Sequence, residues 1–300
     1  MKTYPSLDAS TKVAFIGLGV MGYPMAGHLK KAGAEVTVYN RTTAKAQNWV
    51  KEYGGKMALT PREAAKDADI VFTCVGNDDD LRSVVYGNDG IFVGMKQGAV
   101  LWDDTTDSAN VARELYAKAK ELGFHFVDAP VSGGQAGAVN GVLSVMCGGD
   151  EDVIEKCRPV VMSFASNIER IGQCGAGQLA KMCNQICIAG ILQSLSEAIA
   201  FGMTENLDMQ KVIDAISKGA AGSWQMVNRS PTMIEGKFDF GFAVDWMRKD
   251  LGICLDEAKR SGAQLPLTAL VDQFYSKVQA DGGNRLDTSS LITLLNTKAK

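Results

Sequence analysis

Short runs of β-branched and aromatic residues alternate with helical patterns through the first half of this 300-residue chain. This alternation predicts a mostly parallel, doubly wound sheet, because each parallel strand reaches the next through a crossover helix. The segment at 60–68 is typical: Thr60 can cap a helix there, and Pro61 can occupy its first turn. The predicted strands cover residues 12–17, 35–40, 69–75, 99–105, 124–130 and 142–149.

Helical spacing replaces the strands after about residue 175, and the glycine-rich stretch IGQCGAG at 171–177 separates the two patterns. We therefore predict a Rossmann-type dinucleotide-binding domain over residues 1–174 and an all-helical domain over residues 175–300. The predicted helices are 177–204, 208–218, 242–261, 266–280 and 288–298; their candidate N-caps are Asp208, Thr288 and Ser289, and their candidate stops are Gly219 and Gly262.

The composition argues against several classes of function. The net charge is −3 and both signs alternate along the chain, so no basic surface for nucleic acid or for a membrane is predicted. The first ten residues lack an apolar core and predict a short flexible leader rather than a signal peptide, which favours a cytoplasmic protein. Seven cysteines without a CxxC pair predict reduced thiols, mostly packed as small hydrophobes. Two histidines cannot form a three-histidine site, and we predict no metal.

A glycine motif follows the first predicted strand and opens a helix. In Gly17-x-Gly19-x-x-Gly22, the first glycine permits a tight turn, the second lets main chain approach a pyrophosphate, and the third lets the helix pack closely on the strand. The helix N-terminus then offers N–H groups to the phosphates. A glycine-rich turn without a ligand is the alternative. The predicted cofactor loop comprises Gly17, Leu18, Gly19, Val20, Met21 and Gly22.

The end of the second predicted strand bears on the choice between NAD and NADP. Asn40 stands where an NAD site usually has a carboxylate, and Arg41 follows it. No neighbouring carboxylate in the sequence repels a 2′-phosphate, and the guanidinium can pair with one. We predict that the cofactor is NADP, although NAD is possible. The alternative interpretation is that Arg41 is a solvated loop residue with no contact to the cofactor. Thr42, after the second predicted strand, and Val75, at the end of the third, are further predicted cofactor contacts.

A second motif, DAPVSGG at 128–134, runs from a strand into a turn at the carboxyl edge of the sheet. Open α/β sheets bind their ligands at this edge. The hydroxyl of Ser132 and the N–H groups of Gly133 and Gly134 can form a nest for a carboxylate. A plain tight turn explains the same residues.

Lys181 heads a run from Met182 to Ser196 that has no charged residue at all. Lys181, Asn184 and Gln185 share one face of a helix. A partly buried lysine has a lowered pKa and can exchange a proton with an alcohol or carbonyl oxygen. The alternative is a lysine that extends outward to water.

These motifs together resemble the β-hydroxyacid dehydrogenases, and the resemblance extends over nearly the whole chain. GLGVMGYPMA, DAPVSGG and GAGQLAKMCNQ are similar to three segments of that family. The resemblance implies that Lys181 is the general acid/base, that Ser132, Gly133 and Gly134 hold the substrate carboxylate, and that Thr106 lies where nicotinamide meets substrate.

The resemblance also extends to FAVDWMRKDL at 242–251. It implies that Phe242, Lys249 and Asp250 close over the site, although Lys249 can instead pair with Asp245 one turn away. The resemblance thereby makes Phe242 and Lys249, together with Thr106, further predicted cofactor contacts. Many relatives carry asparagine four residues after the lysine, whereas this chain has Asn184 and then Gln185, so either amide can contact the substrate. Trp224 is predicted to line the substrate pocket, with Asn228 and Arg229 as further candidates.

The predicted reaction is hydride transfer between NADP(H) and a small 3-hydroxy acid or semialdehyde acid, as in 3-hydroxyisobutyrate dehydrogenase or 2-hydroxy-3-oxopropionate reductase. The alternatives are an imine reductase of the same fold and a non-enzymatic NADP-binding module. A short-chain dehydrogenase would use Tyr116 and Lys120, but its glycine pattern differs and the expected serine is absent, so these residues are interpreted as an exposed helix face. The resemblance and the apolar helix at 177–204 also predict a homo-oligomer, a dimer or a tetramer.

Overall fold

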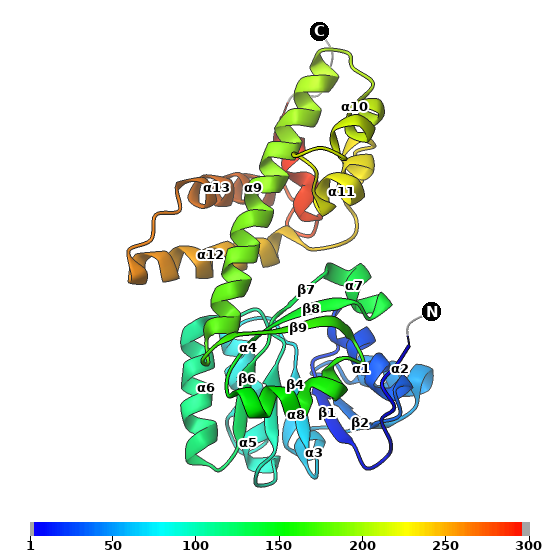
Figure 1. Ribbon diagram of the computed structural model, residues 1–300, viewed down its shortest axis with the longest axis vertical. Helices are drawn as coiled ribbons and strands as arrows, with labels where there is room; N and C mark the ends of the chain where they lie inside the picture. The colour runs from blue at the N-terminus through cyan, green and yellow to red at the C-terminus, as the bar shows by residue number, and fades with distance from the viewer. Residues whose placement is uncertain (1–2, 296–300) are drawn as a thin grey trace. The chain divides into compact units, whose positions relative to one another are not determined.

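The computed structural model describes residues 3–295, and the chain divides into two compact units, Met1–Lys181 and Met182–Lys300. Helix α9 (Ala176–Thr204) contributes residues to both units. The first unit is coloured blue to green in Figure 1, and the second continues from green to red. The predicted boundary at 174/175 lies just before α9 begins, whereas the two units divide within its second turn.

The first unit is built on one sheet with the strand order β3-β2-β1-β4-β5-β6-β8-β7, and β9 pairs with β8. The pairs from β3 to β6 are all parallel, while β8 runs antiparallel to β6 and β7. The chain winds outward from β1 to β3 and then returns to β4 on the other side of β1. This reversal creates a crevice at the carboxyl ends of β1 and β4, which is where such sheets bind ligands. The strands are β1 Lys12–Ile16, β2 Glu35–Tyr39, β3 Lys56–Met57, β4 Ile70–Thr73, β5 Val100–Asp103, β6 His125–Asp128, β7 Val131–Ser132, β8 Leu143–Gly148 and β9 Ala165–Gly172.

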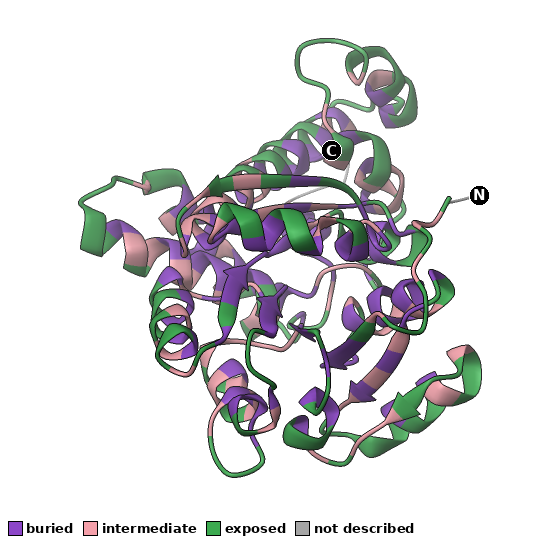
Figure 2. Cartoon of the chain, turned by 60° about the horizontal axis from the view of Figure 1, so that its bottom comes forward, coloured by how far each residue is buried: buried purple, intermediate pink, exposed green. Residues whose placement is uncertain are grey.

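Helices cover both faces of this sheet and enclose two apolar layers. Strands β4 and β5 are buried along their whole length, and Figure 2 shows the strands largely in the colour of buried residues. On one face the rings of Phe15 and Phe72 stack at 5.7 Å. The predicted cap at Thr60 is confirmed, since its hydroxyl accepts the N–H of Glu63 at 3.1 Å. The helices are α1 Gly22–Lys31, α2 Thr43–Tyr53, α3 Pro61–Ala65, α4 Asp78–Val85, α5 Ile91–Gly94, α6 Ala109–Glu121, α7 Gly134–Asn140 and α8 Glu151–Val161.

The second unit is helical, with a single isolated β-bridge among its described residues. Asp208 caps α10 as predicted, and Gly262 ends α12 with φ +82°. The candidate caps Thr288 and Ser289 were wrong, because Asp287 caps a 3₁₀ helix there; residues 296–298 of that prediction lie outside the described residues. α10 ends at Ile216, before the predicted stop at Gly219. After α9, the elements of the second unit are α10 Met209–Ile216, α11 Trp224–Ile234, α12 Val244–Ser261, α13 Pro266–Ala280 and η1 Thr288–Leu294.

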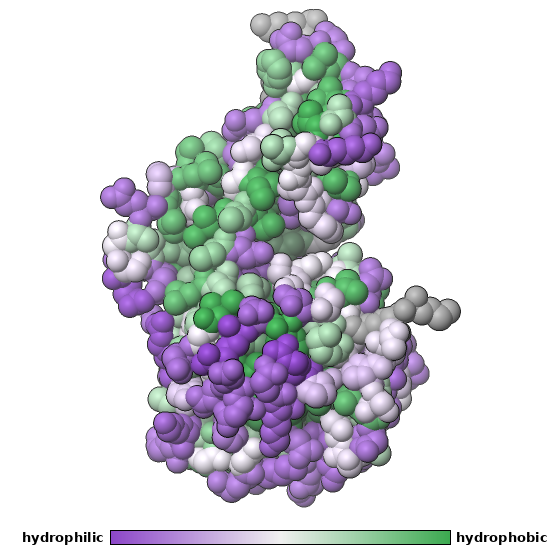
Figure 3. All heavy atoms as spheres, in the orientation of Figure 1, coloured by the Kyte–Doolittle hydropathy of each residue, from purple (hydrophilic) through white to green (hydrophobic). Residues whose placement is uncertain are grey.

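Helix α9 has 29 residues and, by length and composition alone, could cross a membrane. The core helix of a soluble protein passes the same test, and 44% of its most apolar window is buried inside the structure. One stripe of its surface is exposed and carries a single charged residue, Glu197: Cys183, Cys187, Ile191, Ser194, Glu197, Ala198 and Phe201. Figure 3 shows hydrophobic residues on the face of the second unit along which α9 runs.

Candidate active site

The three glycines after β1 have the geometry that a dinucleotide loop requires. Gly17 has φ +100°, and a Cβ there would lie 2.2 Å from the carbonyl oxygen of Cys74. A Cβ on Gly22 would lie 2.0 Å from the carbonyl oxygen of Gly17, so only glycine lets α1 approach the strand this closely. A Cβ on Gly19 would meet no heavy atom within 4 Å, which leaves main chain open to a ligand. The loop therefore fits a pyrophosphate at the N-terminus of α1.

Asn40 stabilises this loop through its side chain. Its amide oxygen accepts the N–H of Leu18 at 2.9 Å, and its amide nitrogen donates to the carbonyl of Thr42 at 3.1 Å. The residue at the end of β2 thus fixes the turn between β1 and α1, a role that the sequence analysis did not predict.

Arg41 is not surrounded by neutral groups, which corrects one premise of the sequence analysis. Its guanidinium lies 3.2 Å from the carboxylate of Asp80, in the first turn of α4, and its side chain is 84% exposed. Asp80 is 39 residues away in sequence, so no local pattern could reveal it. A carboxylate therefore competes for the cation that was predicted to hold a 2′-phosphate.

The predicted residues after β4 and β5 lie close to the glycine loop. A Cβ on Gly17 would lie 3.1 Å from the Val75 side chain, and the Val75 N–H donates to the Thr105 hydroxyl at 3.1 Å. Thr106 follows and is half-buried. Val75 and the segment containing Thr106 thus border the crevice at the carboxyl ends of the strands.

The predicted carboxylate nest has an unusual backbone. Ser132 ends β7, and the two glycines after it both have positive φ, +132° at Gly133 and +60° at Gly134. Residues with a side chain rarely adopt such angles. A Cβ on Gly134 would meet no heavy atom within 4 Å, so the backbone conformation rather than close packing favours glycine here, and the space beside it is open. Two successive N–H groups in this conformation can turn toward an anion.

Lys181 is buried, with 8% of its surface exposed, in the second turn of α9. The sequence QCGAG before it offers no side chain to cap the helix. The cap comes instead from Asp128 at the end of β6, whose carboxylate accepts the N–H groups of Gly175 at 2.7 Å and Gln178 at 3.0 Å. Burial raises the pKa of Asp128 to about 7. The lysine thus stands on a helix that is fixed to the sheet.

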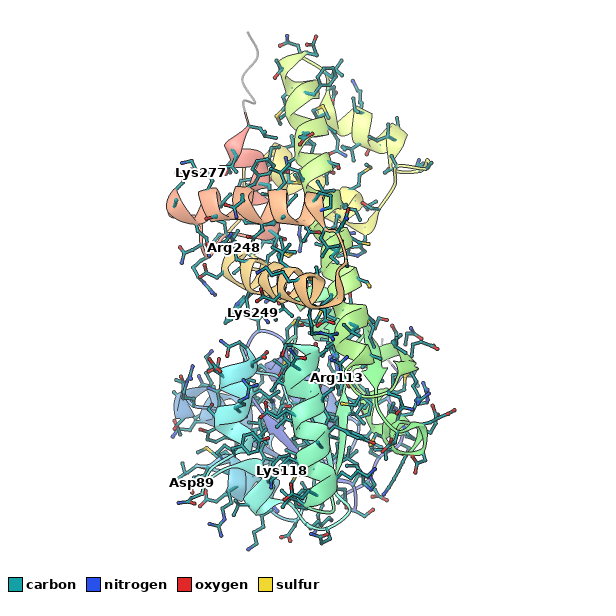
Figure 4. All side chains as sticks on the ribbon, turned by 90° about the vertical axis from the view of Figure 1, so that its left-hand side faces the viewer. Asp89, Arg113, Lys118, Arg248, Lys249 and Lys277 are labelled. Atoms are coloured by element: carbon teal, nitrogen blue, oxygen red, sulfur yellow. The ribbon has the colours of Figure 1, made fainter. Side chains whose placement is uncertain are left out.

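Farther along α9, the two amides belong to a hydrogen-bonded chain within the second unit. Asn184 donates to Gln185 at 2.7 Å, and Gln185 donates to the buried carboxylate of Asp250 at 2.6 Å. Lys249 lies 2.9 Å from the same carboxylate. Asp245, the alternative partner considered for Lys249, accepts hydrogen bonds from the side chains of Gln279 and Asn284. Arg248 lies on the side of α12 toward α13 and Lys249 on the other side (Figure 4).

The segment around Trp224 contains a residue pair that the sequence analysis missed. Arg229 lies 5.1 Å from the ring centres of both Trp224 and Phe240, and its Nε lies 3.2 Å from the fully buried Asp287. Asp287 also accepts the N–H of Phe242 at 2.9 Å. Trp224 is 52% exposed. No sequence signal pairs Asp287 with an arginine so far away.

The structure also bears on the Tyr116 and Lys120 pair, on metal ligands and on the cysteines. Tyr116 donates to Asp150 at 3.0 Å and is half-buried rather than exposed as predicted, which gives it a structural contact in place of a catalytic role; Lys120 is exposed. Within residues 3–295, no group of three metal-ligating side chains is found. Cys147, Cys157 and Cys254 are buried, as predicted for packed thiols, whereas Cys183 and Cys187 are exposed on α9.

Comparison with known proteins decides the family. Residues 12–172 match the family model described as the NAD binding domain of 6-phosphogluconate dehydrogenase, and residues 175–295 match the one described as the NAD-binding domain of NADP-dependent 3-hydroxyisobutyrate dehydrogenase. The chain is 34% identical to the 2-hydroxy-3-oxopropionate reductase of Escherichia coli, over 96% of this chain and 98% of that one. The chain belongs to the β-hydroxyacid dehydrogenase family. It is therefore an oxidoreductase of an NAD(P)-dependent family whose members act on small hydroxy acids.

Two further relatives support this assignment. An oxidoreductase of Shewanella frigidimarina, itself named uncharacterized, is 63% identical over 95% of this chain and 98% of its own. A solved structure of Mycobacterium tuberculosis 3-hydroxyisobutyrate dehydrogenase with L-serine superposes with a TM-score of 0.85 at 32% identity, covering 95% of this chain and 98% of that one. The predicted fold class, a Rossmann domain followed by a helical domain, is confirmed.

Proposed function

We propose that this protein transfers a hydride between NADP(H) and a small 3-hydroxy acid or semialdehyde acid, with Lys181 as the general acid/base. The observation that carries the proposal is the burial of the Lys181 side chain on an otherwise uncharged stretch of α9. Burying an ammonium group is unfavourable unless neighbouring groups stabilise it, and perturbed ionisable groups cluster at functional sites, which supports a role for the Lys181 proton. When bound, the nicotinamide cofactor supplies or accepts the hydride at its ring.

The substrate carboxylate would bind at Ser132, Gly133 and Gly134. The two consecutive positive φ angles and the open space beside Gly134 support this role. Binding at a fixed anion site would orient the reacting carbon and restrict the substrates to acids. L-Serine, which is named with the M. tuberculosis structure, is itself a 3-hydroxy acid. The 2-hydroxy-3-oxopropionate that the E. coli relative's name gives is a semialdehyde acid.

In the oxidative direction, neutral Lys181 would accept the hydroxyl proton of the substrate; in the reductive direction, protonated Lys181 would donate it. General acid/base catalysis of this kind typically contributes about 10²–10⁴-fold in rate. Gln185 is buried and held by Asp250, whereas Asn184 is only half-buried. This arrangement favours Asn184 as the amide that contacts substrate.

We further propose NADP over NAD, with Arg41 as the group that contacts the 2′-phosphate. The neutral Asn40 supports this choice, and the pairing of Arg41 with Asp80 at 3.2 Å limits its strength. We also propose that the protein is cytoplasmic and a homo-oligomer. The exposed stripe of α9 supports the oligomer, since it is long, carries only the charge of Glu197 and ends in Phe201, 67% exposed.

Incubation with NADPH and a panel of aldehydes, followed by nicotinamide absorbance, tests the proposal. The panel is glyoxylate, succinic semialdehyde, methylmalonate semialdehyde and tartronate semialdehyde, with a cyclic imine as the rival substrate. Oxidation of NADPH by at least one acid and none by the imine is expected. Turnover of the imine alone would favour an imine reductase, and no turnover with tight NADPH binding would favour a non-enzymatic module.

A further inference from the structure

Gln178 lies three residues before Lys181 on α9, and its side chain is fully buried. A buried primary amide is unfavourable unless its donors and acceptor are used. The Gln178 amide nitrogen donates to the carbonyl oxygen of Thr105 at 2.7 Å, and its amide oxygen accepts the N–H of Asp107 at 3.2 Å. These two main-chain groups flank Thr106 on either side. One side chain on the lysine helix therefore holds both peptide bonds of the residue expected beside the nicotinamide.

The main chain of Gln178 is fixed as well. Its N–H donates to Asp128 at 3.0 Å, and the other oxygen of that carboxylate accepts the N–H of Gly175. The start of α9 packs closely against Asp128. A Cβ on Gly177 would lie 2.6 Å from the Asp128 carbonyl oxygen, and a Cβ on Gly148 would lie 2.5 Å from the Asp128 carboxylate. The first turn of α9 is thus bound to the end of β6 through Asp128 and to the loop after β5 through Gln178.

We propose that Gln178, supported by Asp128, is a positioning residue that keeps Lys181 and Thr106 in a fixed relation for proton and hydride transfer. Both side chains lie outside the predicted catalytic set. Gln178 bonds the main chain of the loop after β5, and Asp128 stands at the end of β6. Both bind the first turn of α9, which is followed directly by Lys181. This inference rests on the proposed role of Lys181. Misplacement of a reacting group by about 1 Å can reduce a rate by about 10²-fold.

A double-mutant cycle tests the proposal. Gln178→Met keeps the volume and removes both side-chain hydrogen bonds. In the full-length enzyme it should lower kcat by about 10- to 100-fold and leave the KM for NADPH nearly unchanged. In a Lys181→Ala background the same substitution should lower kcat far less, because the group that it positions is gone. Asp128→Asn, which keeps one acceptor oxygen, serves as the second variant if Gln178→Met folds poorly.

Val161→Ala is the matched control, since Val161 is fully buried on α8, belongs to the apolar layer on one face of the sheet and takes no part in the hydrogen bonds that hold Gln178. It should lower the melting temperature without changing kcat per cofactor-binding site. If Lys181→Ala is impaired but Gln178→Met lowers kcat by the same factor in the wild-type and Lys181→Ala backgrounds, this inference is wrong while the proposed function stands. Full activity of Lys181→Ala would overturn the proposed function and this inference with it.

Discussion

The pairing of Arg41 with Asp80 makes a quantitative prediction about cofactor choice. A charge-assisted hydrogen bond to a phosphate is typically worth about 1.5–3 kcal/mol, or roughly 10- to 100-fold in affinity. Arg41 is 84% exposed and Asp80 lies 3.2 Å from it, so the lower end applies. Wild-type enzyme should therefore favour NADPH over NADH by roughly tenfold.

Removing the competing carboxylate should strengthen this preference. An exposed ion pair is worth about 0.2–1 kcal/mol, so Asp80→Asn should raise the NADPH-to-NADH affinity ratio by up to about fivefold. Arg41→Ala should bring the ratio close to one. Asn40→Asp combined with Arg41→Ala should favour NADH; the new carboxylate keeps an oxygen for the Leu18 N–H, so the glycine loop is preserved.

Titration of each variant with both cofactors, followed by tryptophan fluorescence, measures these ratios. Asp79→Asn is the matched control, because Asp79 stands one residue earlier on α4, pairs with Arg82 at 3.5 Å and carries the same charge. It should move the ratio less than Asp80→Asn does. Equal affinity of wild type for NADH and NADPH, unchanged by Arg41→Ala, would refute the role of Arg41.

Three further outcomes are expected. Methyl esters of the active semialdehyde acids should be poor substrates, and Ser132→Ala should raise the KM of the acid; comparable kcat/KM for acid and ester would exclude the carboxylate nest. Burial raises the pKa of Asp128 from 3.8 to about 7, so the folded protein binds more protons than the unfolded chain between these values. That contribution to stability is complete below about pH 4 and is lost as pH rises through 7, by at most about 1.4 kcal/mol per pH unit. Denaturant unfolding should show this slope in wild type but not in Asp128→Asn; identical slopes would contradict it. Phe201→Glu should shift light scattering toward monomer by weakening burial worth about 1.5–3 kcal/mol per copy. Val227→Glu on α11, where the wild-type side chain is 57% exposed against 67% for Phe201, should not; a wild-type monomer would contradict the oligomer.

The sequence predicted the parts of the fold that local chemistry determines. Among the six predicted strands, β4 and β5 are continuous buried runs, as strands covered on both faces must be, and β2 alternates half-buried with buried residues. The missed strands β3 and β7 have two residues each, and β9 is a largely polar edge strand with a bulge at each end, so their pattern is weak. Helix α11 was missed although Ser223 caps it, because Gly219 and Gly222 just before it indicate a turn.

The candidate site was predictable only where function depends on short motifs. The glycine loop, the nest and Lys181 each stand in one contiguous stretch. The groups that support them come from distant segments: Asp80 reaches Arg41, Asp128 caps α9, and Asp287 holds Arg229. Asp128 belongs to the DAPVSGG motif. Only its contact with α9 reveals that its carboxylate caps a helix and does not bind a ligand.

The general acid/base role of Lys181 is the central claim, and steady-state turnover of Lys181→Ala tests it most directly. The measurement uses saturating NADPH and the best semialdehyde acid of the panel, with NADPH affinity and the melting temperature determined on the same sample. We expect kcat to fall by about 10²–10⁴-fold while NADPH binding and folding are retained. Turnover close to that of wild type would show that the buried lysine is structural and that this mechanism is wrong.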